Sequence, residues 1–279
     1  MIETVLSAGD LKLAALDNQV DGPVVIGLHG YLDNAESMKV LAPYFKAYRY
    51  IAVDLAGHGR SQHRPLGTHY NQADYIQDLY ALLQSEQFSD VILVGHSLGG
   101  ILASMFASLF PEKVRAVVSI DACGPLVEDE STTHQQMRTA IINRFEKGHS
   151  QPRPVDLDKA VEARCKISDI PAVAARSILS RNLKEEADGQ QFWSSDTRLR
   201  TKSILRLTEK QAENLLRAIV CPMLIIGASG SFKNLEANYP KRASWFKNAR
   251  YEQLVGGHHI HMENTEDVGA LISQFVEQL

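Results

Sequence analysis

The sequence contains few cysteines, and their spacing suggests no pairing. Cys123, Cys165 and Cys221 are the three cysteines among 279 residues, and no CxxC motif occurs. An odd number of isolated cysteines argues against a disulfide scaffold, and it supplies no paired thiolates for a structural zinc site. We therefore expect free, buried thiols in a reducing compartment, which predicts a cytoplasmic protein.

Long apolar runs and an excess of basic charge are also absent. No segment approaches the roughly 18 apolar residues that span a bilayer, and the first 15 residues include Glu3 and Asp10, so no secretory signal is expected. Lys and Arg number 29 against 33 Asp and Glu, a net charge of −4. Nucleic-acid binding requires a basic face. The sequence thus predicts no membrane span and no nucleic-acid partner, and it leaves the oligomeric state open.

What is present is an alternation of short apolar segments with helical ones. Residues 24–28, for example, are entirely apolar, which is typical of a strand covered on both faces. This alternation predicts an α/β fold with a doubly wound, mostly parallel, eight-stranded sheet, whose strand ends form a ligand-binding edge. The predicted strands are 4–6, 11–15, 24–28, 50–53, 91–94, 114–120, 223–226 and 251–255, and the predicted helices are 35–46, 73–85, 98–110, 232–246 and 266–279.

The alternation stops after residue 124. Residues 125–215 contain no convincing strand pattern and carry nine of the sixteen arginines, although their net charge is nearly zero. We interpret this segment as a helical cap inserted after the sixth strand, with 1–124 and 216–279 forming the core domain. An insertion that leaves the sheet at its ligand edge would cover a pocket.

A candidate nucleophile lies where a predicted strand meets a predicted helix. The sequence Gly-His-Ser-Leu-Gly-Gly at 95–100 follows an apolar strand and begins a helix. A tight turn of this kind exposes the serine hydroxyl, and its glycines avoid clashes. We assign Ser97 as the nucleophile, whereas His96 is expected to line the pocket or to support the catalytic residues without contacting substrate.

Two backbone amides are candidates for an oxyanion hole, in which fixed donors stabilise a developing negative charge. One is the amide of Leu98, at the start of the helix, and the other is that of Tyr31, in the loop after strand 24–28. His29 and Gly30 precede Tyr31, and His29 is expected to brace the loop.

The general base is expected in the loop after the last predicted strand. The sequence Gly-Gly-His-His-Ile-His at 256–261 offers three histidines. His258 is our choice, because it directly follows the glycine pair, and such a residue can accept the serine proton and return it to a leaving group. His259 is expected to line the pocket, and the spacing of the three histidines suits a metal site poorly.

The acid is the least determined member of the site. The loop at 227–232, where an acid between nucleophile and base is expected, contains no carboxylate. Asp121, at the end of strand 114–120, is the favoured candidate, and Glu236 is the alternative. Asp121 could also serve only as a cap at the start of the insertion.

These segments together resemble the α/β-hydrolase superfamily. The His-Gly loop, residues 54–61 (DLAGHGRS), the turn at 95–100 and the tail GGHHIHMEN carry the resemblance, which is closest to the serine hydrolase-like branch. It implies that 54–61 is a structural loop and that His261 is not catalytic. Some members of the superfamily place the acid after the strand matched here by 114–120, which favours Asp121.

The sequence therefore predicts a serine hydrolase acting on small carboxylic (acyl) esters through an acyl-enzyme, with no cofactor and no metal. Two alternatives stay open. One is hydrolysis or lysis of a C–C bond in an anionic substrate, which arginines of the insertion such as Arg138, Arg144, Arg164 and Arg176 could bind. The other is a ligand-binding relative that has lost catalysis.

Overall fold

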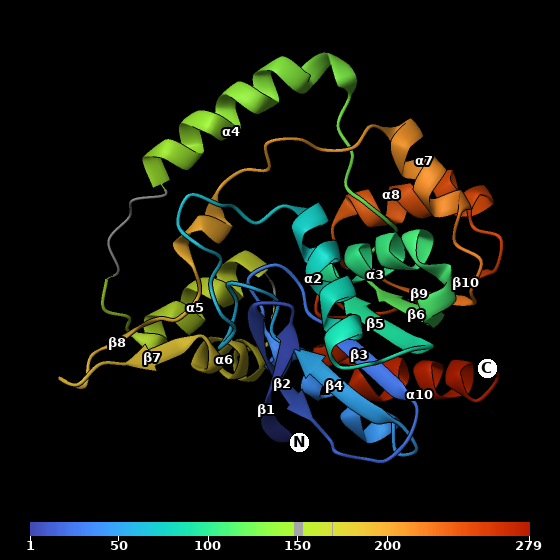
Figure 1. Ribbon diagram of the computed structural model, residues 1–279, viewed down its shortest axis with the longest axis horizontal. Coiled ribbons are helices and arrows are strands. Elements are labelled where there is room, and N and C mark those ends of the chain that lie inside the picture. The colour runs from blue at the N-terminus through green and yellow to red at the C-terminus, as the bar shows by residue number, and fades with distance from the viewer. Residues whose placement is uncertain (148–152, 169) are drawn as a thin grey trace.

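The computed structural model describes residues 1–147, 153–168 and 170–279, and it is built around one large sheet (Figure 1). The sheet has eight strands in the order β1-β2-β4-β3-β5-β6-β9-β10. Strand β2 is antiparallel to β1 and β4, and the other neighbours are parallel. The predicted fold class is confirmed. The strands are β1 (Ile2–Ala8), β2 (Leu11–Asp17), β3 (Val24–Leu28), β4 (Arg49–Val53), β5 (Val91–His96), β6 (Val114–Ile120), β9 (Met223–Ala228) and β10 (Ala249–Leu254).

Helices cover both faces of this sheet, which is why its central strands are apolar throughout. Helices α2 (Gln72–Ser85), α3 (Leu98–Leu109) and α7 (Glu209–Arg217) pack into one core layer with alternate strand residues such as Leu93. Helices α1 (Ala35–Lys39) and α10 (Thr265–Val276) pack into the opposite layer with residues such as Ile92. Two buried layers hold the strands in a fixed register, so the loops at their carboxyl ends are placed on rigid supports.

Two predicted helices are shorter than the sequence suggested. The helix predicted at 35–46 ends at Lys39 and is followed by a separate 3₁₀ turn, Ala42–Tyr44, that contains Pro43. Proline lacks an N–H group and clashes with the preceding turn, so it interrupts a continuous helix. The helix predicted at 232–246 is α8 (Lys233–Arg242) followed by the 3₁₀ turn Ala243–Trp245.

The segment between β6 and β9 forms a layer of its own beside the sheet (Figure 1). Its helices are α4 (Thr133–Lys147), α5 (Leu157–Ser168) and α6 (Ala172–Arg181). Val161, Ala175 and Ile178 belong to a small core separate from the sheet. Helix α7 spans the predicted boundary at residue 215 and packs its Leu216 into the main core.

The prediction of no strand in this segment was wrong. Strands β7 (Leu183–Glu185) and β8 (Gln191–Trp193) form a two-stranded sheet. Each has only three residues, none of them buried, so no apolar run signals it.

No helix within the described ranges combines the length and the hydropathy needed to cross a membrane. The cytoplasmic location stays a prediction.

Candidate active site

Ser97 lies in a strained turn between β5 and α3. Its backbone has φ 49° and ψ −113°, a conformation that side-chain-bearing residues rarely adopt. A Cβ atom on Gly99 would lie 2.0 Å from the carbonyl oxygen of Leu28, and one on Gly95 would lie 2.2 Å from the backbone of Gly99. The turn therefore requires glycine on either side of the serine, and it leaves Ser97 partly exposed at the carboxyl edge of the sheet.

Asp121 follows β6, the neighbour of β5, and it is held by the loop after β9. Its amide donates to the carbonyl of Ile226 at 2.7 Å, and its Oδ1 accepts from the amide of Ala228 at 3.2 Å. The hydroxyl of Ser231 donates to Oδ2. The β9 loop thus contains no acid but supplies donors that fix one. The side chain of Glu236, the alternative acid, lies outside the described part of the structure.

His258 extends from the loop after β10 towards Asp121. Its Nδ1 contacts Oδ2 of Asp121, and the carboxyl group is only 1% exposed. A carboxylate can only accept, so Nδ1 carries the proton and Nε2 is left as the basic nitrogen. Phe232 packs on the imidazole at 4.6 Å between ring centres. Ser97, Asp121 and His258 line one cavity of about 240 Å³.

The two candidate oxyanion amides come from neighbouring elements. Leu98 is the first residue of α3, and an amide at that position has no acceptor inside its own helix. Tyr31 lies in the loop after β3, and its hydroxyl donates to the carbonyl of Leu199 at 2.8 Å, joining this loop to the insertion. A Cβ atom on Gly30 would approach Nδ1 of His96 to 2.8 Å, so the loop lies close against the turn that holds Ser97.

His29 braces the loop that carries Tyr31. Its Nε2 accepts from the amide of Leu55 at 2.9 Å, and its Nδ1 donates to the carbonyl of Gly30 at 2.7 Å. Complete burial lowers the pKa of His29 to about 4. The ring is therefore neutral at pH 7 and uses both nitrogens to hold backbone.

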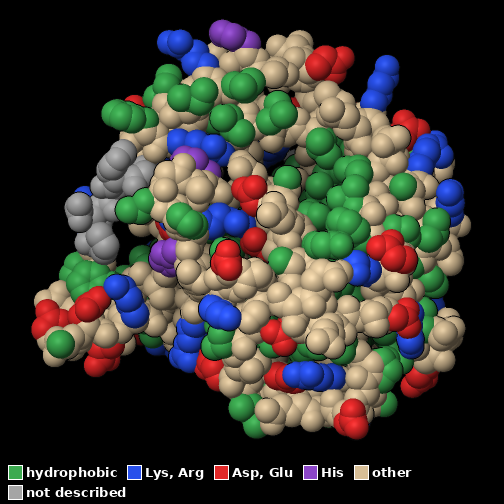
Figure 2. Space-filling view, in the orientation of Figure 1, with side chains coloured by type: hydrophobic (Ala, Val, Ile, Leu, Met, Phe, Trp, Pro, Cys, Tyr) green, Lys and Arg blue, Asp and Glu red, His purple; other side chains and the backbone are tan. Residues whose placement is uncertain are grey.

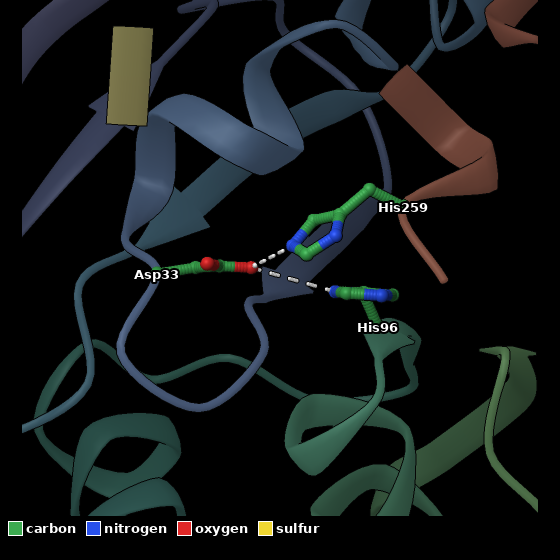
Figure 3. Close-up of side chains that lie close together, drawn as sticks. All are labelled: Asp33, His96 and His259. Atoms are coloured by element: carbon green, nitrogen blue, oxygen red, sulfur yellow. Dashed lines mark hydrogen bonds and ion pairs between the residues drawn. The ribbon is translucent and has the colours of Figure 1, made fainter. Parts of the chain in front are cut away.

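His96 and His259 line neither cavity at Ser97 and instead form a buried cluster with Asp33, which the sequence did not reveal (Figure 3). His96 donates from Nε2 to the backbone carbonyl of His258 at 2.8 Å, and its Nδ1 lies 3.7 Å from Asp33. His259 donates from Nε2 to the same carboxylate at 3.1 Å. Arg164, from α5 of the insertion, binds the other oxygen of Asp33 at 2.6 Å. These hydrogen bonds thus hold the loop after β10 at two consecutive residues, His258 and His259.

Electrostatics in this cluster favour a charged Asp33 and a neutral His96. Burial alone would raise the pKa of Asp33, but the hydrogen bond from His259 and the charge of Arg164 hold it well below its usual range. Burial lowers the pKa of His96 to about 4, although Asp33 opposes the shift. Asp33 could not be found from the sequence, because its partners come from three distant segments.

The same cluster contains the atoms that could coordinate a metal. Ligand atoms of Asp33, His96 and His259 lie within 4.8 Å of one another, and all three residues are buried. The guanidinium of Arg164 already neutralises the carboxylate, and a second cation beside it would be repelled. We therefore interpret the cluster as a hydrogen-bonded support, and the absence of a metal from the mechanism stays a prediction.

A second cavity, of about 380 Å³, is also lined by Ser97 and shares Ile101 and Leu126 with the first. Tyr31, Tyr70 and Tyr75 contribute to its wall, and so do cationic side chains that the sequence analysis did not select: Arg200, Lys202 and Arg206.

The arginines suggested from the sequence lie elsewhere. Arg164 binds Asp33, Arg176 binds Asp158, and Arg144 donates to Asn71 at 2.9 Å. None of them lines either cavity at Ser97, and neither does Arg138. Which arginines of the insertion face the nucleophile depends on the path of the irregular segment after Arg198, and no residue pattern encodes that path.

A third cavity, larger than the two at Ser97, is not lined by the serine. It has about 1150 Å³ and is lined by residues such as His63, Lys184 and Trp193, none of them a predicted site residue. Size therefore does not identify the site here, whereas the chemistry around Ser97 does.

A serine in a strained strand-to-helix turn of a mostly parallel sheet is a feature of the α/β-hydrolase fold. The model of the alpha/beta hydrolase fold family matches residues 23–265, and the chain belongs to that family, in its serine hydrolase-like branch. It is a hydrolase.

Three relatives illustrate the similarity. A serine hydrolase-like protein of Danio rerio is 31% identical, and the alignment covers 94% of this chain and 85% of that protein. A hypothetical protein from Pseudomonas aeruginosa PAO1 has a crystal structure that is 31% identical, with a TM-score of 0.89 and coverage of 99% of this chain and 98% of that chain. A thioesterase domain from the curacin biosynthetic pathway is 26% identical, with a TM-score of 0.83 and coverage of 98% and 99%.

Proposed function

We propose that the protein hydrolyses carboxylic esters through an acyl-enzyme, with Ser97 as nucleophile, His258 as base and Asp121 as acid. The observation that carries the proposal is the contact of Asp121 with Nδ1 of His258, in a cavity that Ser97 also lines. This contact fixes the tautomer in which Nε2 can accept a proton, and it stabilises the imidazolium that forms.

The chemistry follows from these positions. The Oγ of Ser97 attacks the ester carbonyl carbon while its proton passes to Nε2 of His258. The amides of Tyr31 and Leu98 donate to the resulting oxyanion. Collapse of the intermediate breaks the bond to the alcohol oxygen, which takes the proton from His258. Water then attacks the acyl-serine by the same steps in reverse, which releases the carboxylic acid and regenerates the serine.

The test is the hydrolysis of 4-nitrophenyl butanoate by the Ser97→Ala variant. Removing the nucleophile of such a unit typically lowers kcat by about 10⁶, so we expect no turnover above the uncatalysed rate. Ser108→Ala is the matched control, because Ser108 is a buried serine of α3 whose hydroxyl has no partner within the described residues. Circular dichroism checks that both variants fold. Unchanged turnover by Ser97→Ala would refute the proposal.

A fluorophosphonate probe separates this proposal from a ligand-binding relative that has lost catalysis. The probe labels a serine only where a base activates it. We expect labelling of the wild-type protein and of Ser108→Ala, and none of Ser97→Ala or His258→Ala. Labelling that persists without His258 would contradict the assigned base.

A further inference from the structure

Ser97 lines two cavities that differ in the polarity and charge of their other lining residues. The cavity of about 240 Å³ has a largely apolar wall beyond the proposed catalytic groups, with Ile101, Ala122, Leu126 and Phe232. The cavity of about 380 Å³ carries three cations, and no carboxylate of the described residues lines it. A substrate bound across the serine would place an apolar group on one side and meet positive charge on the other.

The cations of the larger cavity differ from other arginines of the insertion in how they are paired. Arg181 and Arg198 each bind a buried aspartate, at 2.9 and 2.6 Å. Within the described residues, by contrast, Arg200 and Lys202 have no ion pair, and Arg206 reaches Glu128 only at 3.5 Å. The charges of Arg200 and Lys202 are therefore available to a ligand, whereas Arg206 shares its charge with Glu128, which lines the neighbouring cavity.

The polar groups around these cations fit an anion. Ser203 supplies a hydroxyl donor and Gln72 an amide, whereas the hydroxyl of Thr201 donates to the carbonyl of Arg198 at 2.7 Å. Tyr70 and Tyr75 do not add free hydroxyls, because these donate to Asp196 at 2.7 Å and to a backbone carbonyl at 3.3 Å. The tyrosines thus contribute ring surface, while donors and positive charge come from the insertion.

The cationic cavity continues outward beneath α4. A neighbouring cavity of about 400 Å³ shares Lys202, Ser203 and Arg206 with it. Thr132, which directly precedes α4, and Gln136, which belongs to α4, also line this neighbouring cavity. The space-filling view shows the hollow below this helix, with Lys and Arg side chains near it and apolar side chains along its border (Figure 2). A ligand longer than a simple alcohol can therefore extend from Ser97 towards solvent past three cations.

We propose that the substrate is an acyl ester whose leaving group carries an anion, a carboxylate or a phosphate, held by Arg200, Lys202 and Arg206. The acyl group then occupies the apolar cavity beside Phe232. Guanidinium groups bind carboxylate and phosphate oxygens in the same bidentate manner, so the geometry specifies an anion and not its source. This inference rests on the proposed function, because it concerns the substrate of the same serine.

The test compares butanoate esters of three phenols that share one ring. The leaving groups are 4-hydroxybenzamide (neutral), 4-hydroxybenzoate (a carboxylate) and 4-hydroxyphenyl phosphate. We expect wild-type kcat/KM to be at least about 10-fold higher for one or both charged esters. The triple variant Arg200→Gln/Lys202→Gln/Arg206→Gln should lower kcat/KM for charged esters by about 10- to 100-fold, in keeping with the loss of charged hydrogen bonds. Its kcat/KM for the neutral ester should change less than about 3-fold.

A second triple variant controls for net charge. Arg176→Gln/Lys184→Gln/Arg217→Gln removes the same charge from exposed positions outside both cavities at Ser97, and it should leave all three rates unchanged. Preference for the benzoate or for the phosphate ester identifies the anion, and either result supports the inference. Equal rates for the three esters, or an equal effect of both triple variants, would overturn it while leaving the proposed function intact. Absence of Ser97-dependent cleavage of any ester would refute both.

Discussion

The position of the acid illustrates what single residues can and cannot reveal in a sequence. The β9 loop lacks a carboxylate, so the sequence alone left Asp121 and Glu236 both open. The structure places Asp121 against His258, and Ala228 and Ser231 of the β9 loop donate to it. Ser97 and His258 could be selected because local motifs mark them, whereas the partner of an aspartate depends on how strands are ordered in the sheet.

Asp121→Asn tests the role of the acid. An amide at this position can present its NH₂ group to Nδ1, which then favours the wrong imidazole tautomer. We expect kcat for 4-nitrophenyl butanoate to fall by about 10³- to 10⁴-fold, with KM changed little. Glu236→Gln is the matched control and should retain the wild-type kcat. Loss of activity in the control, with activity retained by Asp121→Asn, would transfer the role to Glu236.

Ser231→Ala separates support of the acid from catalysis itself. Its hydroxyl donates to Oδ2 of Asp121, the oxygen that also contacts His258. Removing this donor leaves Asp121 held by the amide of Ala228 and by its contact with His258, so we expect kcat to fall less than about 10-fold. A loss as large as that of Asp121→Asn would show that Ser231 does more than position the acid.

At the scale of elements, the sheet could be predicted closely and the insertion only in outline. Strands β3, β5 and β9 are apolar runs because both of their faces are covered. In the insertion, β7 and β8 are short and only half-buried, so their pairing depends on the surrounding helices and leaves little pattern in the sequence. The cationic cavity was missed for the same reason, because irregular segments carry it.

The pair between Asp33 and Arg164 joins the loop after β3 to helix α5. Arg164 is 18% exposed and Asp33 is 1% exposed, so the pair is largely shielded from water. Replacing Arg164 by Gln leaves a buried carboxylate with less compensation, and we expect the free energy of unfolding to fall by about 1–3 kcal/mol. Urea denaturation monitored by tryptophan fluorescence measures the change.

A double-mutant cycle shows whether that loss comes from the pair. Asp33→Asn/Arg164→Gln should be less destabilised than the sum of the single variants, with a coupling of at least about 0.5 kcal/mol. Arg176→Gln is the control, because its partner Asp158 is highly exposed, and it should change the free energy of unfolding by less than about 1 kcal/mol. Additive single effects would show that the two side chains act independently.

At the scale of the whole molecule, buried histidines make stability depend on pH. Burial lowers the pKa of His29 and His96 to about 4 and that of His58 to about 3, and it holds the pKa of His261 well below its usual value. In the unfolded chain these groups take up protons near pH 6.5. Between pH 6.5 and 4 the unfolded state therefore binds more protons, and the free energy of unfolding falls as pH decreases. From pH 7 to 5 we expect a loss of about 1–2 kcal/mol per histidine.

His261→Phe tests this dependence with one substitution. Both ring nitrogens of His261 are buried and have no hydrogen-bond partner in the described structure. Phenylalanine keeps an aromatic ring and cannot be protonated. We expect a free energy of unfolding at pH 7 that is unchanged or higher, and a smaller loss between pH 7 and 5 than in wild type, both measured by urea titration. Parallel pH profiles would show that His261 does not contribute.

The residues proposed for catalysis and those proposed for anion binding belong to separate stretches of sequence. Ser97, Asp121 and His258 all belong to loops at the carboxyl edge of the sheet, whereas Arg200, Lys202 and Arg206 belong to the segment between β6 and β9. The catalysed reaction and the substrate specificity can consequently change independently during evolution. Grafting a different insertion between β6 and β9 offers a direct route to new substrate preferences on an unaltered reaction centre.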